Sequence, residues 1–227
     1  MCGRYSLFTG TDELEARFDA DFRSHEPTYN CAPGEELPVI TSESPDEARR
    51  LEWGLTPSWA DERHGHINAR AETVDEKPAF EAAYESHRCL VPADGFYEWV
   101  EQEGSKQPYR VAFEDDRPFA MAGLYERWTP PTTQTGLGDF GGGASTDEEP
   151  VESFTILTTE PNDLVADLHH RMAVILDPET EETWLHGTPE EAAELLEPYP
   201  ATAMTAYPVS TRVNAAGNDG PELIEPV

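Results

Sequence analysis

Short apolar runs separated by turn-forming residues recur along most of this chain, and they limit the folds that it can adopt. The runs are rich in aromatic and β-branched residues, and Gly, Pro, Asp or Asn stands between them, as at Asp94-Gly95. Runs of this length and composition are typical of β-strands in antiparallel sheets. Strands are expected in the second half of 27–41, over 51–60 with a turn at Pro57, on both sides of Asp94-Gly95 within 88–100, and over 108–113, 119–128, 152–159 and 171–176.

Helical patterns are fewer and short. Residues 11–20 are predicted to form a helix, because acidic residues fill the first turn after Thr11 and because Leu14 and Phe18 fall on one face. Residues 161–169 and 189–198 are predicted as two further short helices, the second with a proline in its first turn. This mixture predicts the α+β class, with a curved, mainly antiparallel, barrel-like sheet and flanking short helices.

The length of 227 residues fits one domain with a substantial core, and we expect residues 1–227 to form it. One segment stands apart from the strand pattern, since residues 129–150 are rich in Gly, Pro, Thr and acidic residues. We expect a mobile surface insertion there, which interrupts the domain without dividing it. Such a composition favours a solvated segment over a partner site, and the sequence leaves both open.

The charge of the chain is strongly negative, with 46 acidic against 15 basic residues and a formal net charge of −31. The acids and the aromatic residues are both spread along the whole chain, and the lysines are Lys77 and Lys106. This pattern indicates a folded protein with an acidic, lysine-poor surface rather than a disordered acidic tail. Such a surface is typical of halophilic proteins, because the Debye length falls to about 3 Å at 1 M salt and carboxylate repulsion is screened.

The cysteines predict neither a disulfide framework nor a metal site. They are odd in number and widely spaced: Cys2, Cys31 and Cys89. Without a signal peptide or a long apolar run, neither secretion nor a membrane span is expected. Nitrogen ligands for zinc could come from His64, His66, His169 and His170. No CxxC pair accompanies them, so we expect no metal and no other cofactor.

The first residues, MCGRYS, place Cys2 directly after the initiator methionine. Removal of Met1 would leave Cys2 with a free α-amine beside its own thiol. In model compounds these groups titrate near about 8 and about 8.5, so both are available as nucleophiles close to neutral pH. The alternative is a cysteine without a role at a disordered terminus, and the hexapeptide alone favours that alternative.

Polar residues stand against strand-like neighbours in four stretches: Cys2 with Arg4, Asn68 with Arg70 and Glu72, Glu98 in GFYEW, and His169 with Arg171. Each has a structural alternative. The Glu98 side chain could face solvent, His169 or His170 could interact with the C-terminal dipole of a short helix, and the arginines could pair with nearby carboxylates. Taken one by one, these stretches do not establish a site.

Nine stretches together resemble the SOS-response-associated peptidase (SRAP) family, in the order that the family has them, over nearly the whole chain. They are MCGRYS, YNCAP at 29–33, WGLTPSW at 53–59, NARAET at 68–73, RCLVPADGFYEW at 88–99, KQPYRV at 106–111, AGLYERW at 122–128, HHRMAVIL at 169–176 and PVSTRVN at 208–214. The acidic surface and the segment 129–150 lie outside the resemblance.

The resemblance implies that the chain binds abasic sites in single-stranded DNA and becomes covalently linked to them, which shields the lesion during the response to DNA damage. The aldehyde of the ring-opened sugar would condense with the Cys2 amine to a Schiff base, and the thiol would then close a five-membered thiazolidine. Both nucleophiles must therefore belong to one residue. This lyase-like Schiff-base chemistry would follow removal of Met1, for which the family's peptidase activity is a candidate.

By the same resemblance, Asn68 would hold the Cys2 amine and the sugar in register, and Glu98 would take part in proton transfer. His169 would be the second acid/base group. The family pattern is His, a polar residue, Arg and Met, and this chain has His170 at the polar position and Ala173 where proline is usual. The choice of His169 over His170 therefore rests on a pattern from which this chain departs at two positions.

The resemblance also implies a DNA-binding surface. Arg4, Arg70 and Arg171 would supply the local positive charge that phosphates require. Trp53 and Trp59 would stack on bases, Pro33 would act as a wedge at a loop tip, and Met172 would lie at the same surface.

A second reading makes the chain a cysteine or N-terminal-nucleophile peptidase that uses Cys2, Glu98 and His169, and it predicts repeated turnover of peptides. A third makes it a passive single-strand DNA-binding module, which predicts no covalent adduct. Among these, the sequence favours the crosslinking protein, acting as a cytoplasmic monomer that is associated with the nucleoid when bound to DNA. No membrane partner is expected.

Overall fold

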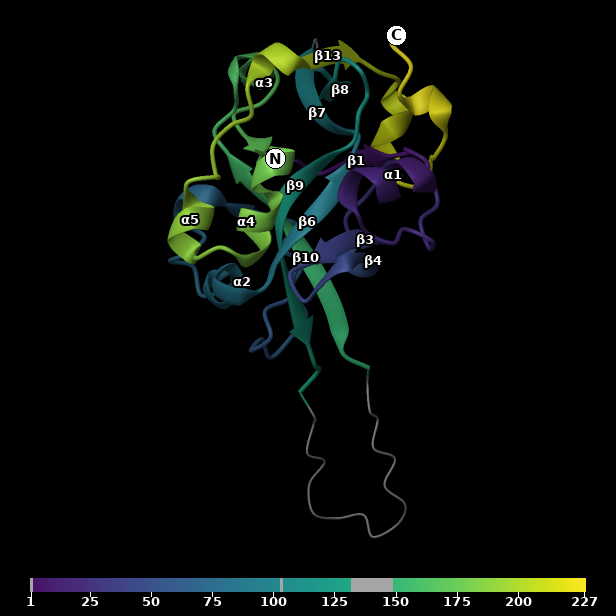
Figure 1. Cartoon of the computed structure of the whole chain (residues 1–227). Helices are drawn as coiled ribbons and strands as arrows, with labels where there is room; N and C mark the ends of the chain where they lie inside the picture. The colour runs from purple at the N-terminus through teal and green to yellow at the C-terminus, as the bar shows by residue number, and fades with distance from the viewer. Residues whose placement is uncertain (1, 103, 132–148) are drawn as a thin grey trace.

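Five strands close into a β-barrel at the centre of the molecule (Figure 1). The computed structural model describes residues 2–102, 104–131 and 149–227. The barrel strands are β3 (Glu36–Thr41), β4 (Ser44–Trp53), β6 (Arg88–Ala93), β9 (Phe119–Trp128) and β10 (Val151–Thr159). Their order is β10-β4-β3-β6-β9, and pairing of β9 with β10 closes the ring. The pairing of β10 with β4 is parallel, and the others in the ring are antiparallel.

A second, antiparallel sheet packs beside the barrel in the order β13-β8-β7-β1-β2. Its strands are β1 (Tyr5–Leu7), β2 (Thr28–Cys31), β7 (Gly95–Gln102), β8 (Ser105–Phe113) and β13 (Met204–Pro208). Three short strands extend the barrel sheet: β5 (Asn68–Arg70) and β11 (Met172–Ala173) pair with β10, and β12 (Ile175–Leu176) pairs with β9. The predicted curved, mainly antiparallel, barrel-like sheet is confirmed.

Short helices flank the two sheets, as predicted for the α+β class. They are α1 (Thr11–Phe18), α2 (Glu81–Ser86), α3 (Asp163–Ala166), α4 (Glu181–His186) and α5 (Pro189–Ala193). Single 3-10 turns are η1 (Ala71–Thr73), η2 (Pro178–Thr180), η3 (Ala201–Ala203), η4 (Thr211–Asn214) and η5 (Pro221–Leu223). In Figure 1, α2, α4 and α5 lie together on one side of the barrel and α1 lies on the other.

The three predicted helices are present, and each is shorter than expected. The helix α1 ends at Phe18, where Asp19 adopts a left-handed conformation. The helix α5 begins at Pro189, and a capping box between Thr188 and Glu191 satisfies its first amides. The helices α2 and α4 were not predicted, because six residues are too few to display a helical period.

The strands predicted on either side of Asp94-Gly95 are present, but they lie in different sheets. The strand β6 belongs to the barrel and β7 belongs to the second sheet, so Asp94 marks the passage of the chain from one sheet to the other. Its buried carboxylate accepts hydrogen bonds from the Ser6 hydroxyl at 2.6 Å and from the Thr9 amide at 3.0 Å. These bonds compensate for the burial of the charge and tie the β1 segment to the junction.

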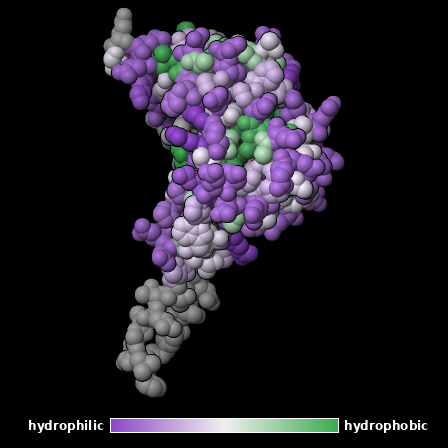
Figure 2. All heavy atoms as spheres, turned by 90° about the vertical axis from the view of Figure 1, so that its left-hand side faces the viewer, coloured by the Kyte–Doolittle hydropathy of each residue, from purple (hydrophilic) through white to green (hydrophobic). Residues whose placement is uncertain are grey.

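The segment 129–150 connects β9 with β10, and residues 132–148 of it lie outside the described residues. The two strands remain paired up to the segment, with Trp128 opposite Val151. Figure 2 shows a face covered mostly by hydrophilic side chains, with hydrophobic ones in patches between them, which agrees with the acidic composition.

Candidate active site

The segment that carries Cys2 is held inside the fold. Cys2 lies directly before β1, and its side chain is fully buried. The Nδ2 atom of Asn68 donates a hydrogen bond to the Cys2 carbonyl oxygen at 2.8 Å. Asn68 begins β5, whose parallel pairing with β10 sets it opposite Ile156. The barrel therefore fixes Asn68, whose side chain holds the N-terminal segment.

The strand β7 brings Glu98 to the same place, because it pairs with β1 and the Tyr97 amide donates to the Arg4 carbonyl at 2.9 Å. Glu98 is 2% exposed, so the alternative in which it faces solvent is excluded. Burial raises the pKa of Glu98 from 4.5 to about 7. This carboxyl group can therefore accept or release a proton near neutral pH.

His169 reaches the site from the segment after α3, where its amide donates to the Val165 carbonyl at 2.8 Å. Its Nδ1 atom lies 4.0 Å from Oε1 of Glu98 and accepts a hydrogen bond from the Arg171 amide at 3.1 Å. Burial lowers the pKa of His169 below its usual value. His170 is exposed, so His169 is the histidine that lies against Glu98.

Burial also changes the reactivity of the Cys2 thiol. Its pKa is raised from 9.0 to about 12, first by desolvation and second by the charge of Glu98. The thiol is therefore protonated at neutral pH, in contrast to the near-neutral titration expected from the sequence. A reaction at this sulfur requires a base that takes its proton.

A cavity of about 430 Å³ opens at Glu98 and His169. Glu98, Trp99, Lys106, His169 and Asn214 line it. The Trp99 indole Nε1 donates to Oδ1 of Asn214 at 2.7 Å. Trp99, Lys106 and Asn214 were not predicted as site residues. Their signal was only their place within the matching stretches GFYEW, KQPYRV and PVSTRVN.

Two of the three predicted phosphate-binding arginines already have internal partners. The Nη1 atom of Arg4 donates to Oδ1 of Asn30 at 2.9 Å and to the Val213 carbonyl at 3.0 Å. Arg171 pairs with Glu72 through both of its terminal nitrogens, at 2.5 and 2.9 Å. A phosphate contact by either guanidinium would compete with these bonds.

Three of the predicted DNA-binding residues are exposed. Arg70 ends β5 with its side chain toward solvent. Trp59 is 62% exposed although its indole donates to the Pro78 carbonyl at 3.1 Å. Pro33 lies in the turn between β2 and β3. These placements leave all three accessible to a nucleic acid.

The structure contradicts the prediction that Trp53 and Met172 contact DNA, because both are fully buried. The Trp53 ring packs against Tyr5 and Phe154, with ring centroids 5.2 and 6.2 Å apart, and its indole donates to a backbone carbonyl. The Met172 sulfur accepts a hydrogen bond from the Asn162 amide. Both side chains are parts of the core and offer no surface to a base.

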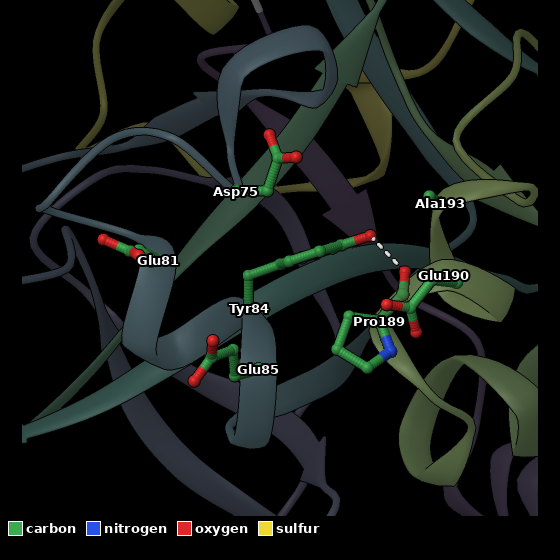
Figure 3. Close-up of a pocket in the computed structure, with 7 residues that line it drawn as sticks. All are labelled: Asp75, Glu81, Tyr84, Glu85, Pro189, Glu190 and Ala193. Carbon is green, nitrogen blue, oxygen red and sulfur yellow. Dashed lines mark hydrogen bonds between the residues drawn. The ribbon is translucent and has the colours of Figure 1, made fainter.

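A separate cavity between α2 and α5 has a different character (Figure 3). The Tyr84 hydroxyl crosses it and donates to the Pro189 carbonyl at 2.9 Å. Its charged lining residues are all carboxylates: Asp75, Glu81, Glu85 and Glu190. This charge repels a phosphate backbone, so the cavity is not a DNA site.

Among the described residues, no group of three or more His, Cys, Asp and Glu side chains is arranged to hold a metal ion. Within the same ranges, no helix is long and apolar enough to cross a membrane.

Comparisons with known proteins find a matching family model and similar proteins. The family model "SOS response associated peptidase (SRAP)" matches residues 1–216. The abasic site processing protein YoqW of Bacillus subtilis (strain 168) is 41% identical, and the alignment covers 99% of each chain. The abasic site processing protein HMCES of Gallus gallus is 33% identical over 100% of this chain and 78% of its own length.

A crystal structure of a protein from Bacteroides thetaiotaomicron has the same fold, with a TM-score of 0.84 and 29% identity, and the match covers 100% of both chains. The family model and the relatives extend over nearly all of the sequence, and the segments that carry Cys2, Glu98 and His169 are included. This chain therefore belongs to the SOS response associated peptidase (SRAP) family.

Proposed function

We propose that this protein binds abasic sites in single-stranded DNA and forms a thiazolidine crosslink to them through Cys2. The convergence of Asn68, Glu98 and His169 on the N-terminal cysteine carries the proposal. The names of the relatives, which are abasic site processing proteins, support the choice of substrate.

The chemistry begins after removal of Met1. The α-amine of Cys2 attacks the aldehyde carbon of the ring-opened sugar, and loss of one water gives the imine. The Cys2 sulfur then adds to the imine carbon, its proton is transferred to the nitrogen, and the five-membered ring closes. The adduct thus equals protein plus DNA minus one water, and no oxidant or metal takes part in the balance.

Because the Cys2 thiol is buried, we assign the removal of its proton to Glu98. Because the thiol pKa is about 12, the sulfur becomes nucleophilic only while a base removes its proton. Glu98, with a pKa of about 7, is partly ionised at neutral pH and can take that proton. His169 lies against it and serves the proton transfers of sugar-ring opening.

Binding of the strand has to overcome a net charge of −31. In this proposal the exposed residues Arg70 and Lys106 supply phosphate contacts, and the exposed ring of Trp59 supplies stacking. Stacking on an aromatic ring resists salt better than a phosphate contact does, so it carries more of the affinity in a saline cytoplasm. The protein acts there as a monomer.

Intact mass spectrometry tests the proposal. The purified protein is measured before and after incubation in molar salt with a single-stranded oligonucleotide that contains one abasic site, beside a Cys2→Ala control. We expect loss of the Met1 mass, and then a shift equal to the oligonucleotide minus one water that the control lacks. A processed protein that shows no shift and hydrolyses peptides repeatedly would refute the proposal in favour of a peptidase.

A further inference from the structure

The Trp99 ring is fixed as a wall of the catalytic cavity by a residue from the other end of the chain. The indole Nε1 donates to Oδ1 of Asn214 at 2.7 Å, and both residues line the cavity next to Glu98. An indole has a single hydrogen-bond donor and no acceptor. Once that donor is used, the ring can offer a ligand only its π-face and its apolar edge.

Asn214 itself is held in place by the anchored turn η4. Val213, its neighbour, is fully buried, and the Val213 carbonyl accepts from Arg4 at 3.0 Å. The Asn30 side chain donates to the carbonyls of Ala215 at 3.1 Å and of Asn218 at 2.8 Å. Bonds on both sides of Asn214 therefore restrict its movement.

The same bonds connect the cavity wall with the reactive end. Arg4, two residues after Cys2, donates both to Asn30 and to η4. The N-terminal segment and the residue that holds the Trp99 ring thus share one hydrogen-bonded network. A fixed distance between a reactive group and a stacking surface lowers the entropic cost of ordering a DNA strand when it binds.

We propose that Asn214 is a positioning residue that holds the Trp99 ring for the nucleotide next to the abasic sugar. This inference rests on the proposed function and specifies how its cavity receives the flanking nucleotide. Because the indole N–H of Trp99 is bound to Asn214, this ring holds the flanking base by stacking and not by a hydrogen bond. The ring therefore accepts any base beside the lesion.

A double-mutant cycle tests the role of Asn214. Asn214→Ala is made in the wild-type protein and in Trp99→Phe, which keeps an aromatic ring but has no N–H. The rate of Cys2-dependent adduct formation is measured against oligonucleotide concentration. In the wild type we expect Asn214→Ala to raise the half-saturating concentration by about three- to tenfold, as for loss of one hydrogen bond, and to leave the maximal rate unchanged.

In the Trp99→Phe background the same substitution should have no effect, because the bond that it removes is already absent. Thr211→Ala, at an exposed position of the same turn, is the matched control and should leave both constants unchanged. An equal effect of Asn214→Ala in both backgrounds, or no effect in either, overturns the proposal.

Base independence is measured with four oligonucleotides that differ only in the nucleotide beside the abasic site. We expect the wild-type half-saturating concentrations to agree within about twofold, since every base has a π-face. A preference of about tenfold or more for one base would show readout by hydrogen bonds and would contradict the inference.

Failure of the proposed function has a different signature, because the wild-type protein would then form no adduct at all. Hydrogen exchange at the Trp99 indole N–H, followed by NMR in the protein alone, still tests the positioning. Exchange should be slow in the wild type and faster in Asn214→Ala. Equal exchange rates in the two proteins overturn the role of Asn214.

Discussion

The Nδ1 atom of His169 lies 4.0 Å from the Oε1 atom of Glu98, which brings the segment after α3 against the middle of β7 beside Cys2. Burial raises the pKa of Glu98 to about 7 and lowers the pKa of His169 below 6.5. Both shifts disfavour the charged form, so Glu98 can gain or lose its proton near neutral pH and His169 favours its neutral form. An acid and a base of this kind suit a reaction in which protons move in both directions.

Replacement of Glu98 should therefore slow adduct formation without unfolding the protein. We expect Glu98→Gln to reduce the rate of adduct formation at saturating DNA by roughly 10²- to 10⁴-fold, as for loss of a general base. The measurement is single-turnover crosslinking at pH 7.5, with Glu101→Gln on the same strand as an exposed control. Intact mass must first show that Met1 is absent from each variant, and a wild-type rate for Glu98→Gln would contradict the assignment.

The same substitution should stabilise the fold at alkaline pH. The folded-state pKa of Glu98, about 7, exceeds its ordinary value of 4.5. Below 4.5 both states are protonated; between 4.5 and 7 only the unfolded state loses the proton, so stability falls as pH rises. The free-energy penalty is complete above pH 7 and amounts to at most about 3 kcal/mol.

Thermal unfolding at several pH values checks this effect. The gain in melting temperature of Glu98→Gln over the wild type should be small at pH 5 and reach its full size at pH 8. A gain that is larger at pH 5 than at pH 8 would have the wrong sign and would show that Glu98 is ionised throughout.

Substitution of the two tryptophans of WGLTPSW should have different effects, one on stability and the other on DNA binding. Trp53→Ala removes a fully buried ring, and we expect it to lower the free energy of unfolding by about 3–5 kcal/mol. Trp59→Ala removes a ring that is 62% exposed, and it should leave the melting temperature unchanged while weakening DNA binding by about 1–3 kcal/mol. Denaturation and fluorescence anisotropy in molar salt distinguish them, and weaker binding by a stably folded Trp53→Ala would contradict this view.

The contrast between these residues shows what a motif can and cannot predict. The stretch WGLTPSW identifies a segment, but the direction of each side chain depends on the strand that carries it and on what packs there. Trp53 ends β4 and packs in the core against Tyr5 and Phe154, whereas Trp59 lies in the following loop. The prediction that Met172 lies at the DNA-binding surface was wrong for the same reason. The side chain is on β11 and is buried in the core.

The strands illustrate the same limit. The strand β9 has the predicted bounds, because all but one of its side chains are buried and its apolar run is nearly continuous. The strand β4 was predicted only at its end, since its early residues are charged and exposed, and Arg49 pairs with Glu152 across the sheet. The bond between Trp99 and Asn214 joins segments 115 residues apart, and no local pattern predicts such a contact.

The two lysines offer a matched test of the DNA-binding surface. Lys106 lines the cavity, whereas Lys77 lies before α2 and is not among the residues that line it. We expect Lys106→Gln to weaken binding of an abasic oligonucleotide by about 1 kcal/mol at 0.1 M salt and less at 1 M, because a phosphate contact is screened. Lys77→Gln should change nothing, and equal effects of both substitutions would indicate a non-specific charge effect.

The acidic surface predicts that the fold itself depends on salt. Among the described residues, the exposed arginines Arg63 and Arg212 already pair with Glu52 and Glu222, so the excess carboxylates have few cations left to neutralise them. At 1 M salt the Debye length is about 3 Å, and at 0.1 M it is about 10 Å, which lets neighbouring carboxylates repel one another. We expect the melting temperature to fall steeply on dilution from molar to 0.1 M sodium chloride, as measured by circular dichroism. Neutral sucrose, which screens no charge, is the control, and a melting temperature that does not change with salt would refute the assignment of this surface to a saline environment.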